Sequence, residues 1–291
     1  MQEMKEFSSW IETIKRDRRW LSRCYYGWVI FVMLIEYSGR RLIHQLGEPV
    51  LFSPAVDNTY WLLHLMGIPQ FIASNYTAEI TFEVIFLLTT ASCFLAEERF
   101  RMLPVLFTLE FLIYLVTKNS VVAHQEHGVD ALFLMSFIFW TGKETRFSLL
   151  LRSFRYYMLF IFVSAACWKL FRGSAFLPQQ MSEILKSQHL AELSEPVAGT
   201  RLQFIIWLIN HPSISHGLLL AVVAVQLSFL TGFFTKKFDR WLLLFFFLFF
   251  LGDWFVMGLS FYQSWVAALV FLPWSSLQFT SVTHSAKPLV T

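Results

Sequence analysis

The stretch YYMLFIFVSAACWKL, residues 156–170, decides the fold class of this chain. The residues before its lysine are apolar and read as part of a membrane-spanning helix, which needs about 20 apolar residues. Lys169 lies near the end of the run. A lysine at bilayer depth is costly unless it reaches the interface, pairs with an acid or lines a polar cavity. Lys169 therefore marks either the end of a helix or a site.

The composition extends this interpretation to the whole chain. Of 291 residues, 56% are hydrophobic and only 15% are charged, with 33 phenylalanines and 11 tryptophans. These proportions are typical of an integral membrane protein. We predict an all-α, polytopic bundle of about eight transmembrane helices, which leaves little chain for a separate soluble domain. The net charge of +3 falls in short loops, so it bears on orientation, and we expect no nucleic-acid partner.

Apolar runs set the predicted spans. They lie at about 24–44, 78–96, 103–122, 129–142, 156–172, 214–234, 241–258 and 261–275. An interfacial or re-entrant segment is expected at 60–72, where Gly67 and Pro69 break the apolar pattern. Within 173–212, the longest non-spanning stretch, we expect an amphipathic helix at 179–193 and an apolar piece at 202–209. The domain plan is a cytoplasmic basic amphipathic segment at 1–23, a transmembrane domain at 24–275 and a cytoplasmic tail at 276–291.

Basic residues set the predicted orientation. With the N-terminus inside, most of the 23 lysines and arginines fall in cytoplasmic segments, as the positive-inside rule requires. Both termini are therefore expected in the cytoplasm, with the protein in a bacterial inner membrane. All histidines except His284 fall toward the outer side. Either they form a polar outer vestibule, or polar residues simply collect in the outer loops.

Ionisable residues inside the predicted spans are the first site candidates. They are Glu36, Glu79, Glu83, Glu110, Lys169 and Asp253. Because lipid does not solvate charge, such residues usually face the bundle interior and pair. Glu79 and Glu83 share a helix face. They are either a paired-carboxylate site or structural partners of Lys118, Lys169 or an arginine.

Two histidines form a second candidate. His124 and His127 lie one turn apart, next to Glu126 and Asp130. That spacing suits a metal, but two histidines lack a firm third ligand, and we predict no metal site. The three cysteines show no CxxC spacing and signal neither a metal nor a disulfide framework.

Three motifs occur in an order that resembles a known family. They are the run at 156–170, the histidine-bearing entry AHQEHGVDALFL at 123–134, and SHGLLL at 215–220 leading to QLS at 226–228 and KKFDR at 236–240. Together they are similar to the membrane domain shared by vitamin K-dependent gamma-carboxylases and the bacterial proteins called HTTM, for horizontally transferred transmembrane domain. The chain departs from that pattern at Gln226, where the carboxylases have an acid, and at Asp253, near a carboxylase histidine. It also lacks their large lumenal domain.

The resemblance implies a site and a chemistry. Lys169 would be the catalytic base, with His124 or His127 in the family's histidine position. Reduced vitamin K or another quinone would bind near His216 and Gln226, against an apolar wall of Trp168, Phe162, Phe204 and Trp207. In the family the base deprotonates the reduced quinone, reaction with oxygen gives the epoxide and a strong base, and a carbanion captures CO2. A lysine amine in an apolar pocket is suited to such a role.

An alternative belongs to another class of protein. The chain would then be a non-catalytic membrane protein that binds lipid, carries a small solute or scaffolds a protein partner of unknown identity, and Lys169 and Arg172 would extend to the interface. For the enzyme hypothesis, we expect Lys169, one of the two histidines, and one of Glu79, Glu83 or Glu110 to converge on a cavity in the outer half. We expect a quinone-linked reaction on a small molecule more than carboxylation of a protein.

Overall fold

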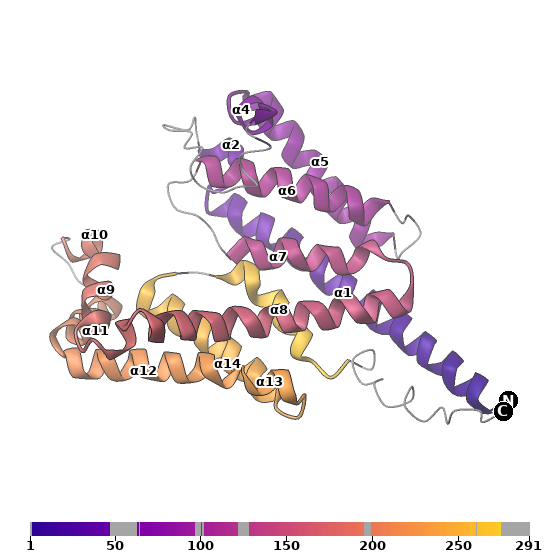
Figure 1. Cartoon of the computed structure of the whole chain (residues 1–291). Helices are drawn as coiled ribbons and strands as arrows, with labels where there is room; N and C mark the ends of the chain where they lie inside the picture. The colour runs from indigo at the N-terminus through magenta and orange to yellow at the C-terminus, as the bar shows by residue number, and fades with distance from the viewer. Residues whose placement is uncertain are drawn as a thin grey trace. The chain divides into compact units, whose positions relative to one another are not determined.

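The computed structural model describes residues 2–46, 63, 65–96, 100, 102–121, 128–194, 199–259 and 261–274. Across these residues the regular elements are all helices, without a strand (Figure 1). This confirms the predicted all-α class for the described part of the chain. The helices form two compact units. The first runs to Phe154 and includes Pro273 and Trp274, and the second runs from Arg155 to Leu272.

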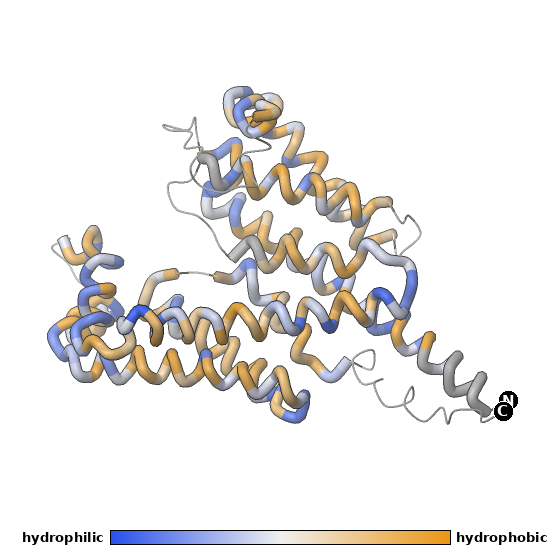
Figure 2. The backbone as a smooth tube through the Cα atoms, viewed as in Figure 1, coloured by the Kyte–Doolittle hydropathy of each residue, from blue (hydrophilic) through white to orange (hydrophobic). Residues whose placement is uncertain are grey.

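Four helical segments among the described residues are long and apolar enough to cross a membrane: Tyr76–Leu95, Glu144–Phe171, Pro212–Phe234 and Asp239–Met257. The shortest has 19 residues, and at about 1.5 Å per residue its length is close to the roughly 30 Å hydrocarbon core. Apolar residues follow one another along these helices in Figure 2. By length and composition, these four helices suggest an integral membrane protein, in line with the prediction from the composition.

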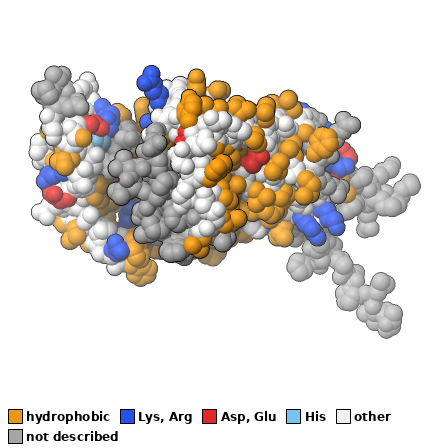
Figure 3. Space-filling model, turned by 90° about the horizontal axis from the view of Figure 1, so that it is seen from above, with side chains coloured by type: hydrophobic (Ala, Val, Ile, Leu, Met, Phe, Trp, Pro, Cys, Tyr) orange, Lys and Arg blue, Asp and Glu red, His pale blue; other side chains and the backbone are white. Residues whose placement is uncertain are grey.

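The helix α5 (Tyr76–Leu95) is polar inside and apolar outside. Five of its six buried residues are polar or ionisable, namely Glu79, Glu83, Thr89, Thr90 and Cys93. Its exposed residues include Val84, Ile85, Leu87, Leu88 and Leu95. Hydrophobic side chains likewise cover much of the face shown in Figure 3. This is the reverse of a water-soluble amphipathic helix, and it suits a helix whose outer face meets lipid.

The first unit packs around aromatic residues. It contains α1 (Gln2–Ser38), α2 (Ile43–Leu46), α4 (Ile68–Ala73), α5, α6 (Leu103–Val121), α7 (Gly128–Ser136), the 3-10 turn η1 (Phe137–Trp140) and the start of α8. The helix α5 packs on α1 and α6, and α4 packs on both α5 and α6. Phe86 stacks on Phe107 and Tyr114 in their midst. The buried Tyr25 hydroxyl donates to the Leu132 carbonyl, 2.9 Å away.

The N-terminal segment joins the first predicted span in one helix. Residues 1–23 and 24–44 are expected as separate parts, yet α1 runs unbroken from Gln2 to Ser38. Residues 2–23 contain neither proline nor glycine, so no residue of that stretch interrupts helical hydrogen bonding. After Ser38, Arg40 adopts a left-handed conformation and the chain turns into α2.

The second unit contains the rest of α8 (Glu144–Phe171), followed by a group of short helices and then two long ones. In order these are η2 (Ser174–Phe176), α9 (Gln180–Gln188), α10 (Leu190–Leu193), α11 (Thr200–Asn210), α12 (Pro212–Ser228), α13 (Thr231–Phe234), α14 (Asp239–Gly252), η3 (Asp253–Met257) and η4 (Tyr262–Phe271). The expected helix at 179–193 is interrupted at His189, between α9 and α10. The expected span at 241–258 ends in η3, which is π-helical, and the one at 261–275 is the 3-10 helix η4.

A buried arginine fixes the start of this unit. Arg155 is fully buried, and its guanidinium donates to both Asp239 carboxylate oxygens at 3.0 and 2.6 Å and to the Gly232 carbonyl at 3.0 Å. The expected span began at residue 156, whereas α8 begins at Glu144 and buries Arg155 within the helix. Because a bidentate arginine fixes both position and direction, this contact ties together α8, α13 and α14.

Candidate functional site

Lys169 lies in the last turn of α8 and is partly buried. Its Nζ atom donates to Gln226 Oε1 at 3.1 Å, and more weakly to the Ala165 carbonyl at 3.4 Å. Gln226 is 97% buried on the inner face of α12, since only 3% of its surface is exposed. Gln226, one of the positions at which the chain departs from the carboxylase motif, is thus a direct partner of the lysine.

Asp253 is the acidic residue that interacts with Lys169 in the second unit. It follows the last residue of α14 and begins η3, close enough to Lys169 for the two charges to interact. Among the described residues no hydrogen bond joins its carboxylate to the amine, so the pair is looser than that of Arg155 and Asp239. Short π-helical segments inside α-helices are frequent at functional sites.

Asp253 lines a cavity of about 200 Å³, and Lys169 is not among its lining residues. Its walls come from α9, α12, α14 and η3, and include Met181, Leu218, Val222, Phe249 and Asp253. Asp253 is the charged group in a wall that is otherwise apolar apart from backbone. Typical small-molecule pockets measure about 300–1,000 Å³, so this cavity suits a ring-sized group and not an entire lipid. Asp253 connects it to the lysine.

The predicted aromatic wall does not line this cavity. Phe162 is buried in the core, stacked on Phe229 with ring centres 4.2 Å apart. Trp168 is exposed, and the Arg172 guanidinium lies 4.3 Å from its ring centre. Phe204 and Trp207 are partly exposed and stack on each other at 5.9 Å. These rings surround other parts of the unit, while aliphatic side chains and Phe249 form the cavity wall.

His216 is a partly buried residue near the start of α12. Its Nδ1 atom is buried without a hydrogen-bond partner among the described residues. The other predicted histidines, His124 and His127, lie outside the described residues, and their role stays a prediction.

The predicted intramembrane glutamates belong to the first unit, and the contacts that the structure gives for them are with other residues of that unit. Glu36 pairs with Lys118 at 2.9 Å, and both side chains are at most 4% exposed. Glu83 accepts the backbone N–H of Ile43 at 2.7 Å and also contacts His44. Glu110 accepts from Thr89 at 3.2 Å, and Glu79 is buried one turn before Glu83. Lys118, named as a possible partner of Glu79 or Glu83, therefore forms an ion pair with Glu36.

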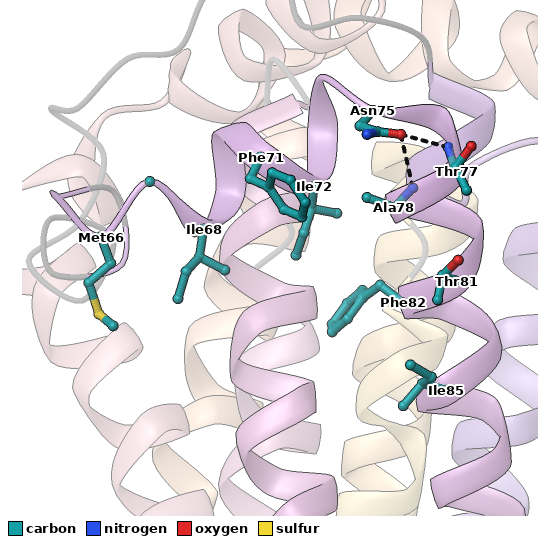
Figure 4. A pocket seen from close by; sticks show the side chains of 11 residues that line it. Met66, Ile68, Phe71, Ile72, Asn75, Thr77, Ala78, Thr81, Phe82 and Ile85 are labelled. Atoms are coloured by element: carbon teal, nitrogen blue, oxygen red, sulfur yellow. Dashed lines mark hydrogen bonds between the residues drawn. The ribbon is translucent and has the colours of Figure 1, made fainter.

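A larger cavity of about 780 Å³ lies in the first unit between α4 and the start of α5 (Figure 4). Phe71, Ile72, Phe82 and Ile85 point into it, and none of the described residues that line it is charged. Asn75 at its rim accepts from the N–H groups of Thr77 and Ala78 and so caps α5. The cavity therefore offers apolar contact without an acid or base.

No group of three or more histidine, cysteine, aspartate or glutamate side chains that could hold a metal occurs in the part of the chain that the structure describes. Cys24, Cys93 and Cys167 are free thiols. The chemistry available beside the cavity is thus that of an amine, an amide and a carboxylate.

Comparison of the chain with protein-family models, with curated proteins and with solved structures finds no match. The functional argument therefore rests on the geometry of the second unit and on the motif resemblance.

Three residues that the motifs did not mark form a network at η3, in which His189 and Arg201 contact η3 and Glu192 contacts both of them. His189, Glu192 and Arg201 come from the short helices α10 and α11 and the residue before α10. His189 was noted only as one of the outer histidines. Its partner lies 67 residues away, and no sequence spacing signals such a contact.

Proposed function

We propose that this chain is a membrane protein similar to the HTTM domain of vitamin K-dependent gamma-carboxylases, and that it binds a reduced quinone-type lipid with Lys169 as general base. One observation carries the proposal. The Lys169 amine is held by Gln226 and faces Asp253, which forms part of the wall of a small apolar cavity.

The residues of this site suit a hydroquinone headgroup. Lys169 would accept the proton of a hydroquinone hydroxyl, while Gln226 orients the amine through its side-chain oxygen. The Asp253 carboxylate would balance the ammonium charge that results. The apolar walls would exclude water from the reacting hydroxyl. When bound, the hydroquinone supplies the reducing power for reaction with oxygen.

The proposal also includes a membrane topology with more spans than the four long apolar helices. The segments 24–44, 103–122, 129–142 and 261–275 would cross the membrane as well, giving about eight spans, with both termini in the cytoplasm of a bacterial cell. Replacing Cys24, Cys93 and Cys167 with serine gives a background for single cysteines at positions 2 and 289. In sealed cells an impermeant maleimide should label neither position, and labelling of either from outside contradicts the topology.

A direct assay tests the activity. The purified protein in lipid is given reduced vitamin K, oxygen and labelled CO2, and the quinone products are separated by chromatography. We expect vitamin K epoxide without labelled carboxylated protein. Lys186→Ala is a suitable control, because this exposed lysine on α9 forms only a surface pair with Glu183, and it should retain the activity.

The opposite result supports the non-catalytic alternative. If no epoxide forms, and mass spectrometry identifies the co-purified lipid as ordinary phospholipid, the chain is better described as a lipid-binding, solute-carrying or scaffolding membrane protein.

A further inference from the structure

The π-helical segment η3 is held from outside by two side chains. His189 Nε2 lies 2.8 Å from the Val256 carbonyl, and Arg201 Nε donates to the Phe255 carbonyl at 3.0 Å. The carbonyl groups in the last turn of a helix lack partners within the helix. Donors from His189 and Arg201 satisfy two of them, and positive charge at a helix C-terminus is favourable.

Glu192 links these two donors. One carboxylate oxygen lies 3.3 Å from His189 Nδ1, and the other accepts from Arg201 Nη1 at 3.2 Å. His189 is 98% buried, since its exposed fraction is 2%. Both carboxylate oxygens are thus engaged in one small network, and its geometry is fixed more tightly than that of isolated surface pairs.

The chain beyond η3 packs closely against the same network. Gly258 has φ of 70°, and a Cβ atom there would lie 2.9 Å from Arg201 Nη2 and 3.5 Å from a His189 ring carbon. On the other side, Val256 packs into a core with Met181, Leu185 and Leu219. The C-terminal end of η3 is therefore held on two sides, and its first residue is Asp253.

We propose that His189, Glu192 and Arg201 are positioning residues, which hold η3 in its π-helical form so that Asp253 faces Lys169 at the cavity. The inference rests on the proposed function of that site and adds residues distant from the amine. None of the three lines the cavity, although His189 contacts the backbone carbonyl of Val256, which does. They act through the backbone carbonyl groups of Phe255 and Val256.

The test measures the reactivity of Lys169 and does not depend on quinone turnover. Purified protein in lipid is treated with a membrane-permeant acylating reagent, and the rate of Lys169 modification is followed by peptide mass spectrometry. Only an uncharged amine is acylated, and a neighbouring carboxylate favours the charged form. Asp253→Asn should therefore speed acylation about fivefold, the Boltzmann factor for a screened charge pair.

The positioning residues should reproduce that effect. His189→Leu and Arg201→Met, which remove the donors to the η3 carbonyl groups, should each speed acylation, as Asp253→Asn does. His189→Gln keeps a donor for the Val256 carbonyl and should stay near the wild-type rate. Combining His189→Leu with Asp253→Asn should add nothing, because the histidine acts through the aspartate. Circular dichroism and size-exclusion profiles establish that each variant is folded.

Several outcomes overturn the proposal. These are a wild-type rate in folded His189→Leu, an equal effect of His189→Leu with and without Asp253, or no effect of Asp253→Asn. If the variant with leucine fails to fold, the comparison of His189→Gln with Arg201→Met decides, since the proposal requires only the second to differ from wild type. The expected acylation pattern without epoxide formation would leave the positioning role intact and refute the quinone reaction alone.

Discussion

Within the second unit, α8 has a buried basic residue at Arg155 and a second one 14 positions later at Lys169, and the two are held differently. Arg155 makes three hydrogen bonds and is fully buried. Lys169 is partly exposed and has one side-chain hydrogen bond, to a neutral amide. Arginine suits fixed bidentate pairs, whereas lysine readily changes protonation when it is buried. The contacts of Arg155 hold helices together, whereas those of Lys169 leave its amine able to gain or lose a proton.

The same contrast separates Lys169 from the first unit. There, the buried lysine Lys118 pairs with Glu36 at 2.9 Å, and the larger cavity has no charged wall. In the second unit the charge of Lys169 interacts with that of Asp253, and Asp253 lines a cavity. A buried basic side chain therefore indicates a functional site when its hydrogen-bond partner is neutral and a cavity lies nearby. It indicates a structural role when a close ion pair neutralises its charge.

The largest effect on stability should come from Arg155→Met. This change leaves Asp239 buried without its partner, which typically costs about 3–5 kcal/mol. We expect a much lower unfolding midpoint in mixed detergent micelles. Adding Asp239→Leu should restore part of the loss, because the unpaired carboxylate is then removed. A midpoint unchanged by Arg155→Met would show that this pair does not hold the unit together.

A smaller loss should follow from Gly232→Ala. A Cβ atom at this position would lie 2.5 Å from a Leu159 methyl carbon and 2.9 Å from one of Leu242, and such overpacking typically costs about 1–3 kcal/mol. Gly217→Ala on α12 is the control, since nothing lies within 4 Å of its added carbon. It should not lower the unfolding midpoint. Equal midpoints for the two variants would contradict the close packing of α13 against α8 and α14.

The smallest effect on stability should come from Lys169→Met. This replacement removes a hydrogen bond to a neutral partner, worth about 0.5–1.5 kcal/mol, and leaves an apolar side chain beside apolar walls. Comparing its unfolding midpoint with that of Arg155→Met tests whether the two basic residues of α8 differ in their contribution to stability. A loss as large as that of Arg155→Met would mean that Lys169 is a structural residue.

The sequence predicted the elements better than the contacts between them. The bounds of α5 and α6 fall within two residues of the predicted spans, because a long apolar run is a strong sequence signal for a membrane-spanning helix. Gln226 and Asp253 were each noted as departures from the family pattern, but their meeting at Lys169 depends on how α8, α12 and α14 pack. The break at His189 and the π turn after Gly252 arise from tertiary contacts, which local propensity does not encode.

The central claim is that Lys169 serves as a base. The most direct measurement compares epoxide formation from reduced vitamin K by the wild-type protein, Lys169→Ala and Lys169→Arg, all folded in the same lipid. We expect activity in the wild type alone, because alanine has no base and arginine stays protonated. Activity in Lys169→Arg close to that of the wild type would contradict the claim, since a group that keeps its proton cannot accept another.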